Sequence, residues 1–271
     1  MGIKFQVPYN FASDYIGKMS QHTDLFKHIR FVYLPAWKED ALNSRMNIAF
    51  ENEYPKTYDE YVIHIKLLQA LGLTVCILGQ KSITYETVEK YYAMGIRHFV
   101  LNNDELAVVL KEKHDDIYLG LSITRNLTFA EICNEGNDFS MYDEIILHHW
   151  FARHLTEVKQ LPDKYNYTMI ANSSCYYGCK WGPAHWYAIG ENPEEYLKAI
   201  RPSIEKCQAC IHDIRDTAYI EPENLHYFDS EVVAYKLVDR EWPTDRIINA
   251  LQEYVERNPV VPRDEAFYNL P

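Results

Sequence analysis

Residues 74–101 read TVCILGQKSITYETVEKYYAMGIRHFVL, and this stretch contains a complete strand–helix–strand unit. The near-continuous apolar run Thr74–Leu78 predicts a strand that is buried on both faces. Residues Val88–Ala93 belong to a helix that ends at Gly95, because glycine readily adopts the left-handed conformation that follows many helices. The next strand is expected at His98–Leu101. Two apolar strands joined by a helix are typical of a parallel sheet with helices on its faces.

The same alternation of apolar runs and helical patterns extends along the whole chain. Across residues 58–71 apolar side chains recur every three or four positions, which predicts a helix that Gly72 ends. Further strands are expected at Ile3–Val7, Phe31–Leu34, Ile117–Ile123, Glu144–Leu147, Tyr167–Ala171, Thr217–Ile220 and Val232–Val238. About eight such units favour an α/β fold, a closed (β/α)8 barrel of the TIM type, over an open doubly wound sheet. No linker or change in composition divides residues 1–271, so we expect a single domain.

Active sites in (β/α)8 barrels lie where the strands end and pass into their helices. Polar residues gather at those strand ends: Gln6, Asn10, Gln80, Asn102, Asn103, Ser122, Thr124, His148, His149, Asn172, Ser173, Lys236 and Arg240. We predict that five of them contact the substrate, namely Gln6, Asn102, Asn172, Lys236 and Arg240.

Two of these groups have a second interpretation. Asn102, Asn103 and Asp104 are equally typical of turns and helix N-caps, and Asp104 is placed to cap the helix that follows. Lys236 and Arg240 share one face of a strand, and two buried cations need anionic partners. Those partners are either a substrate or carboxylate side chains of the protein itself.

His148 and His149 are the candidate catalytic residues, because histidine exchanges protons near neutral pH. Adjacent residues of a strand face opposite sides of the sheet, so we expect at most one of the two to point into the barrel. The alternative is a structural histidine that bonds to a neighbouring backbone carbonyl.

Four cysteines form two closely spaced pairs, Cys175 with Cys179 and Cys207 with Cys210. Thiolates are soft ligands, and four of them suit a 4Fe–4S cluster or Zn²⁺. We therefore predict a metal-binding, cysteine-rich region over residues 172–213, inserted after strand six of the barrel. Two disulfides, or four ordinary buried thiols, are the alternatives.

The composition limits where the protein works and what it binds. The formal net charge is −12, and no run of Lys or Arg interrupts the acidic balance. An extended nucleic-acid-binding surface is therefore not expected, although a local pocket for one anionic group is compatible with this charge. The sequence also shows neither a signal peptide nor a membrane-spanning apolar stretch, so we expect a cytoplasmic protein with reduced cysteines.

The C-terminal part carries a resemblance to a known family. From Tyr219 the chain reads YIEPENLHYFDSEVVAYKLVDREWPTDRIINALQEY, and its centre reads ANSSCYYGCKWGPAHW from Ala171. Both stretches resemble the collagenase-like "U-thirty-two peptidase" family, although Asp239 stands where the family motif has glycine. The matching residues are Pro222, Glu223, Asn224 and Leu225 in a turn, Lys236, Leu237 and Arg240 in a strand, Tyr254 in the last helix, and Asn172, Cys175, Cys179 and His185 in the central stretch.

The resemblance implies a barrel enzyme that holds an iron–sulfur cluster through four cysteines. Similar members are linked to oxygen-independent hydroxylation of quinone precursors or RNA, whereas others are described as peptidases. The chain has neither a Gly-x-Ser-x-Gly elbow nor a His-Glu-x-x-His helix, so its residues give a peptidase mechanism little support. The leading hypothesis is an iron–sulfur enzyme acting on a small molecule or RNA. The alternative is a zinc-stabilised barrel that binds a protein partner or acts as a non-catalytic subunit of an oligomer.

Overall fold

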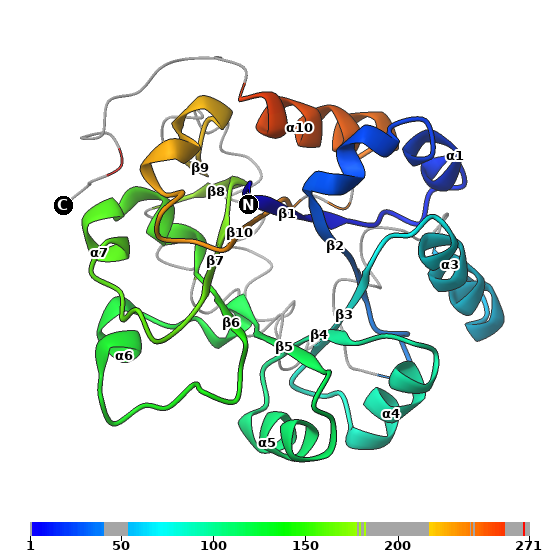
Figure 1. The fold of residues 1–271 in the computed structure, drawn as a ribbon, viewed down its shortest axis with the longest axis horizontal. Coiled ribbons are helices and arrows are strands. Elements are labelled where there is room, and N and C mark those ends of the chain that lie inside the picture. Colours follow the sequence, from blue (N-terminus) through cyan, green and yellow to red (C-terminus); the bar gives the residue numbers. More distant parts are fainter. Residues whose placement is uncertain are drawn as a thin grey trace.

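The computed structural model describes residues 2–40, 54–177, 179, 182, 217–238, 240, 242–257 and 268. Within these residues, eight parallel strands close into a barrel in the order β1-β10-β7-β6-β5-β4-β3-β2 (Figure 1). The strands are β1 (Lys4–Pro8), β2 (Ile29–Pro35), β3 (Val75–Gln80), β4 (His98–Leu101), β5 (Tyr118–Leu121), β6 (Glu144–Ile146), β7 (Tyr167–Ile170) and β10 (Ala234–Lys236). The predicted α/β fold, a TIM-type barrel, is confirmed.

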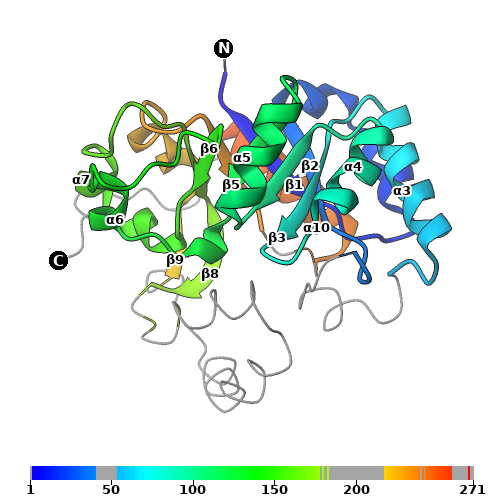
Figure 2. The ribbon, with the colours of Figure 1, turned by 90° about the horizontal axis from the view of Figure 1, so that it is seen from below.

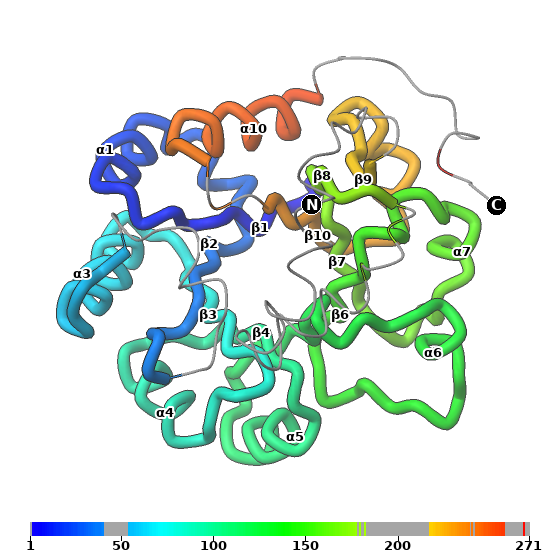
Figure 3. The backbone as a smooth tube through the Cα atoms, turned by 180° about the vertical axis from the view of Figure 1, so that it is seen from behind, coloured from blue at the N-terminus to red at the C-terminus, as the bar shows by residue number. Residues whose placement is uncertain are grey.

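Helices surround the ring of strands, as Figure 3 shows from behind. They are α1 (Tyr15–Met19), α3 (Tyr58–Ala70), α4 (Tyr85–Ala93), α5 (Asp104–Lys113), α6 (Phe129–Cys133), α7 (Leu155–Val158) and α10 (Thr244–Glu256), with 3-10 helices η1 (Thr23–His28), η2 (Ile123–Arg125), η3 (His149–Arg153) and η5 (Pro222–Tyr227). In the described parts of the chain, no helix combines the length and apolar character that crossing a bilayer requires.

The helix boundaries follow from local chemistry. Gly72 and Gly95 both have positive φ values, 79° and 86°, as expected of residues that end α3 and α4. The predicted capping role of Asp104 is wrong, because the side chain of Asn103 accepts the hydrogen bond from the Leu106 amide at 3.0 Å. Asp104 instead occupies the first turn of α5, where a carboxylate complements the helix dipole.

The apolar core has two parts, on either side of the strands. Outward-facing residues pack beneath the helices, where Phe5 of β1 meets Tyr254 of α10 with ring centroids 6.2 Å apart. The inner part fills the barrel and consists of Phe31, Tyr33, Cys76, Leu78, Val100, Ile123, Ile146 and Ile170. A barrel filled in this way is a solid core, so only its two ends are open to ligands.

Two further strands lie outside the barrel. β8 (Asn172–Tyr176) and β9 (Thr217–Tyr219) pair antiparallel with each other, at the end of the barrel opposite the N-terminus (Figure 2). The prediction of Thr217–Ile220 as a barrel strand is therefore wrong, because β7 pairs directly with β10. The cysteine region also follows the seventh barrel strand, β7, and not strand six. Short apolar runs with irregular connections do not reveal from sequence which runs pair.

Candidate functional site at the barrel mouth

The carboxyl ends of the barrel strands carry a ring of buried polar side chains. None of its members is more than 7% exposed: Gln80, Asn102, Ser122, Thr124, His148, Asn172, Lys236 and Arg240. Polar groups that are withdrawn from water need hydrogen-bond partners, so each contact within this ring restricts what remains for a ligand.

Gln80, Ser122 and Thr124 form one side of the mouth. The Gln80 carbonyl oxygen accepts hydrogen bonds from Ser122 Oγ at 3.0 Å and from Thr124 Oγ1 at 2.9 Å. Asn102 Nδ2 donates to Thr124 Oγ1 at 3.2 Å, and Arg125 donates to Asn102 Oδ1 at 3.4 Å. Asn102, a predicted substrate contact, thus lies at the mouth and bonds to both neighbours.

The backbone at Gln80 is strained. Its φ is 54°, in the left-handed region that non-glycine residues rarely occupy, and the ladder with β4 shifts register between Leu78 and Gln80. Such a conformation costs on the order of 1 kcal/mol or more and persists only where the surroundings enforce it. The preceding position is restricted as well, because a Cβ atom on Gly79 would lie 2.7 Å from Ile83 Cγ2, so glycine alone fits there without displacing Ile83.

Asn172 connects β8 to the end of β10. Its Oδ1 accepts from the Val238 amide at 2.7 Å, and its Nδ2 donates to the Val238 carbonyl at 3.3 Å. Its contact with substrate stays a prediction. This reciprocal pair does show that the side chain holds the chain in place after β10.

Lys236 and Arg240 are both buried, 6% and 7% exposed. Lys236 Nζ lies 4.2 Å from the centroid of the Tyr33 ring, which belongs to the inner core, so the ammonium group faces the inside of the barrel. The Tyr33 hydroxyl donates to the Leu237 carbonyl at 2.5 Å, and this bond fixes the ring beneath the cation.

Gln6 lies deeper, in a polar network that crosses the barrel interior. Its Nε2 donates to both carboxylate oxygens of Glu144, at 2.9 and 3.1 Å, and to Thr168 Oγ1 at 3.2 Å. Thr168 also donates to Glu144 at 2.6 Å, and Arg30 forms an ion pair with the same carboxylate at 3.2 Å. Gln6 thus has protein partners, and whether it also contacts a ligand stays a prediction.

Glu144 is the buried charge that sequence reasoning missed, since its side chain is 0% exposed. The sequence predicts a strand over Glu144–Leu147 but gives no role to the Glu144 carboxylate. A signal was present in Gly120 of the neighbouring strand, which stands beside Glu144 in the β5–β6 register. A Cβ atom on Gly120 would lie 3.2 Å from the carboxylate, so glycine leaves room for it.

His148 and His149 are both buried, 2% and 1% exposed, with ring centroids 4.1 Å apart. We expected the two side chains to face opposite sides of a strand. Neither residue belongs to a strand, because β6 ends at Ile146 and His148 is the N-cap of η3, so the alternation rule does not apply to them. His148 Nδ1 accepts from the Trp150 amide at 3.3 Å. Burial lowers the pKa of His148 from 6.5 to about 3, so the ring is neutral at pH 7 and carries its proton on Nε2.

The described cysteines Cys175 and Cys179 are of intermediate burial and lie at the same end of the barrel. Cys175, in β8, packs against the inner core. A Cβ atom on Gly182 would lie 3.7 Å from the Trp150 ring and 3.9 Å from Cys179 Cβ. The cysteine segment therefore lies beside the segment that carries His148 and His149.

The second cysteine pair, Cys207 and Cys210, and His185 lie outside the described residues. Among the residues that the structure does describe, no group of three or more potential metal ligands forms. Cys175 and Cys179 supply soft sulfur donors and fit half of the ligand set for a cluster or for zinc. Convergence of all four cysteines stays a prediction.

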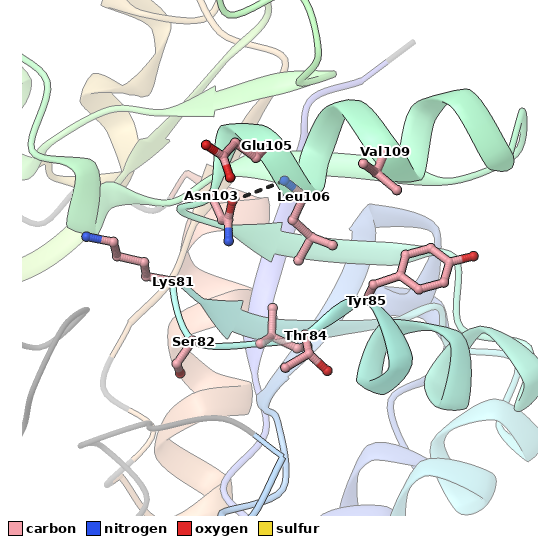
Figure 4. Close-up of a pocket in the computed structure, with 9 residues that line it drawn as sticks. Lys81, Ser82, Thr84, Tyr85, Asn103, Glu105, Leu106 and Val109 are labelled. Carbon is pink, nitrogen blue, oxygen red and sulfur yellow. Dashed lines mark hydrogen bonds between the residues drawn. The ribbon is translucent and has the colours of Figure 1, made fainter.

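A separate depression of about 420 Å³ lies next to the mouth, where β3 and β4 pass into α4 and α5 (Figure 4). Its lining includes the N-caps of both helices, Thr84 and Asn103. Both cap side chains already accept backbone hydrogen bonds, from Thr87 at 3.3 Å and Leu106 at 3.0 Å. The side-chain oxygens of Thr84 and Asn103 therefore already serve as N-caps of α4 and α5.

Comparison with known proteins adds one finding about the fold. No protein-family model and no curated protein matches the chain. Among solved structures, the chain is similar to one described as "The Structure of the U32 Peptidase Mk0906", with a TM-score of 0.50 and 14% sequence identity. The match covers 88% of this chain and 94% of that chain. At this identity the likeness concerns the fold, and it agrees with the resemblance in the cysteine and C-terminal stretches: the chain has the barrel fold of a U32 peptidase.

Proposed function

We propose that the protein is an iron–sulfur enzyme that modifies a small molecule, or a nucleotide of RNA, at the barrel mouth. The reaction class is a redox modification such as an oxygen-independent hydroxylation. One observation carries the proposal: two cysteines, Cys175 and Cys179, lie at the same end of the barrel as a ring of buried polar side chains. Barrel enzymes assemble their sites at this end.

In this proposal the cluster is held by Cys175, Cys179, Cys207 and Cys210. When bound, it supplies electron transfer that side chains cannot provide. Lys236 and Arg240 hold an anionic group of the substrate, and burial strengthens that attraction. His148, neutral at pH 7 with its proton on Nε2, donates a hydrogen bond to a substrate oxygen and so polarises the group that reacts.

Metal analysis of the anaerobically purified protein tests the proposal. We expect a brown protein with stoichiometric iron and sulfide, and a Cys175→Ala variant that loses both. Cys133→Ala is the matched control, because Cys133 lies in α6, away from the mouth, and should leave the metal content unchanged. Iron retained in full by Cys175→Ala would contradict the proposed ligand set.

The second candidate is a zinc-stabilised barrel that binds a partner or serves as a non-catalytic subunit. The same two thiols support it, since structural zinc sites use four thiolates and contribute directly to folding. A colourless protein with one zinc and no iron would favour this candidate. A peptidase is the weakest candidate, because only the likeness in fold supports it.

The catalytic role of the two histidines is tested by separate His148→Gln and His149→Gln variants. Loss of turnover with full metal content in one variant supports a catalytic role for that residue. Full turnover in both variants would remove histidine from the mechanism.

A further inference from the structure

We infer that the side-chain amide of Gln80 is a ligand-binding donor of the barrel mouth, built to bind an acceptor oxygen of a carbonyl or carboxylate group. The inference rests on the proposed function only in placing the ligand at the mouth, and it does not require the iron–sulfur cluster. It adds a specificity-determining residue and a chemical class of ligand to that site.

The direction of the hydrogen bonds around Gln80 is fixed from both sides. Arg125 is a pure donor, so Asn102 must present its oxygen to Arg125 and its Nδ2 to Thr124. Thr124 Oγ1 then already accepts one bond, and its hydroxyl proton has two acceptors, Gln80 Oε1 at 2.9 Å and Ser122 Oγ at 3.0 Å. Arg125 is itself held by an ion pair with Asp104 at 2.7 Å.

The Ser122 hydroxyl also donates its proton to Gln80. Ser122 Oγ accepts from the Thr124 backbone amide at 3.2 Å, which leaves its own proton for Gln80. The Ser122 proton, and the Thr124 proton in the shorter of its two contacts, therefore point at one atom of Gln80, which assigns that atom as the carbonyl oxygen. The opposite placement of the Gln80 amide would turn both contacts into accepted bonds, and the Ser122 proton would lose its acceptor on Gln80.

This arrangement directs the Gln80 NH₂ group away from the network. Nε2 has no hydrogen-bond partner among the described residues, although the whole residue is only 6% exposed. Its two N–H donors are thus oriented, nearly enclosed and available to a ligand. An acceptor oxygen satisfies them, whereas an ammonium or a methyl group does not.

The backbone gives the same residue a fixed position. Gln80 keeps its φ of 54° at the end of β3, and its backbone oxygen accepts from the Asn102 amide at 3.1 Å. The close contact of Gly79 with Ile83 restricts the chain just before it. A donor held by the backbone, by two hydroxyls and by a bulge is preorganised for recognition.

Selective ¹⁵N-glutamine labelling of the purified protein, titrated with benzoate, tests the inference. The Gln80 side-chain signals are those that disappear in Gln80→Glu. We expect benzoate to shift them and aniline, which is similar in size but lacks an acceptor oxygen, to leave them in place. Benzoate that shifts other signals but not these, or that does not bind at all, would overturn the inference.

Gln80→Glu is also the informative variant for affinity. Its carboxylate still accepts from Ser122 and Thr124, so the contacts with the two hydroxyls are kept, while the outward donor becomes an acceptor. The melting temperature and the metal content of the variant are measured beside its affinity. We expect benzoate to bind roughly tenfold more weakly or worse. Gln252→Glu makes the same change on the exposed face of α10, where Gln252 donates to Glu256, and should bind like the wild type. Equal affinity of Gln80→Glu and the wild type would refute the donor role.

A second pair of variants keeps the inference testable if Gln80→Glu folds poorly. Thr124→Val removes a hydroxyl that orients the amide and should weaken benzoate binding, whereas Thr124→Ser should restore it. Equal affinity in the two variants counts against the network. Iron and sulfide measured in the same samples separate the two claims: a metal-free protein whose Gln80 signals still respond to benzoate contradicts the proposed function and supports the inference.

Discussion

At the scale of single residues, the barrel interior depends on the space that Gly120 leaves for Glu144. A Cβ atom at Gly120 would lie 3.2 Å from the carboxylate and 3.3 Å from Val100 Cγ2. Gly120→Ala should therefore destabilise the protein by about 1–3 kcal/mol, measured by urea unfolding, because neither neighbour can move without disturbing packed atoms. Gly17→Ala, where nothing lies within 4 Å of the added atom, is the control and should cause no loss. Equal stability of both variants would show that the interior relaxes freely.

The pH dependence of stability belongs to the same scale. The folded-state pKa of His148, about 3, lies below its ordinary value of 6.5, so the unfolded chain takes up the proton first as pH falls. The stability that the neutral ring contributes is complete above pH 6.5 and is lost towards pH 3. Between pH 7 and pH 5 the wild type should lose about 2 kcal/mol more than His148→Gln. Urea unfolding at both pH values measures this difference, and parallel losses would contradict it.

At the scale of elements, the turn from β3 into α4 couples Gly79 to Ile83. Gly79→Ala should destabilise the protein by about 1–3 kcal/mol, because the added methyl group overlaps the Ile83 side chain. Ile83→Ala alone leaves a cavity, since Ile83 is 2% exposed. In the double variant the two changes compensate, so its loss should fall short of the sum by about 0.5–3 kcal/mol. Strict additivity in urea unfolding would mean that the two side chains do not meet.

The elements also show where sequence reasoning reaches its limit. The strands Phe31–Leu34 and His98–Leu101 were predictable because burial on both faces leaves a continuous apolar run. Thr217–Ile220 has the same appearance, but its partner is β8, and pairing is a tertiary property. The strand-end position of Gln80 was visible in the sequence, whereas its left-handed backbone and its contacts with Ser122 and Thr124 exist only in the closed barrel.

At the scale of the whole molecule, the net charge of −12 determines how the protein meets polyanions. We expect no measurable binding to mixed-sequence duplex DNA or to poly-uridine RNA in filter-binding assays at physiological salt, because phosphate contacts supply most non-specific affinity. An RNA substrate would then be recognised through one local site at the mouth. Micromolar binding with a steep salt dependence would contradict this expectation and indicate an extended basic surface.

The antiparallel ribbon of β8 and β9 affects how the sequence of this barrel can change in evolution. Asn172 pairs with Tyr219 and Tyr176 with Thr217, so the ribbon brings together the two ends of the segment between them. The free energy of closing a loop rises only with the logarithm of its length, by about 0.6 kcal/mol for each doubling. A segment rooted in this way can lengthen, shorten or exchange its sequence while β7 and β10 keep their register. The barrel thus offers an insertion point at which evolution, or a protein engineer, can replace one segment and retain the eight-stranded scaffold.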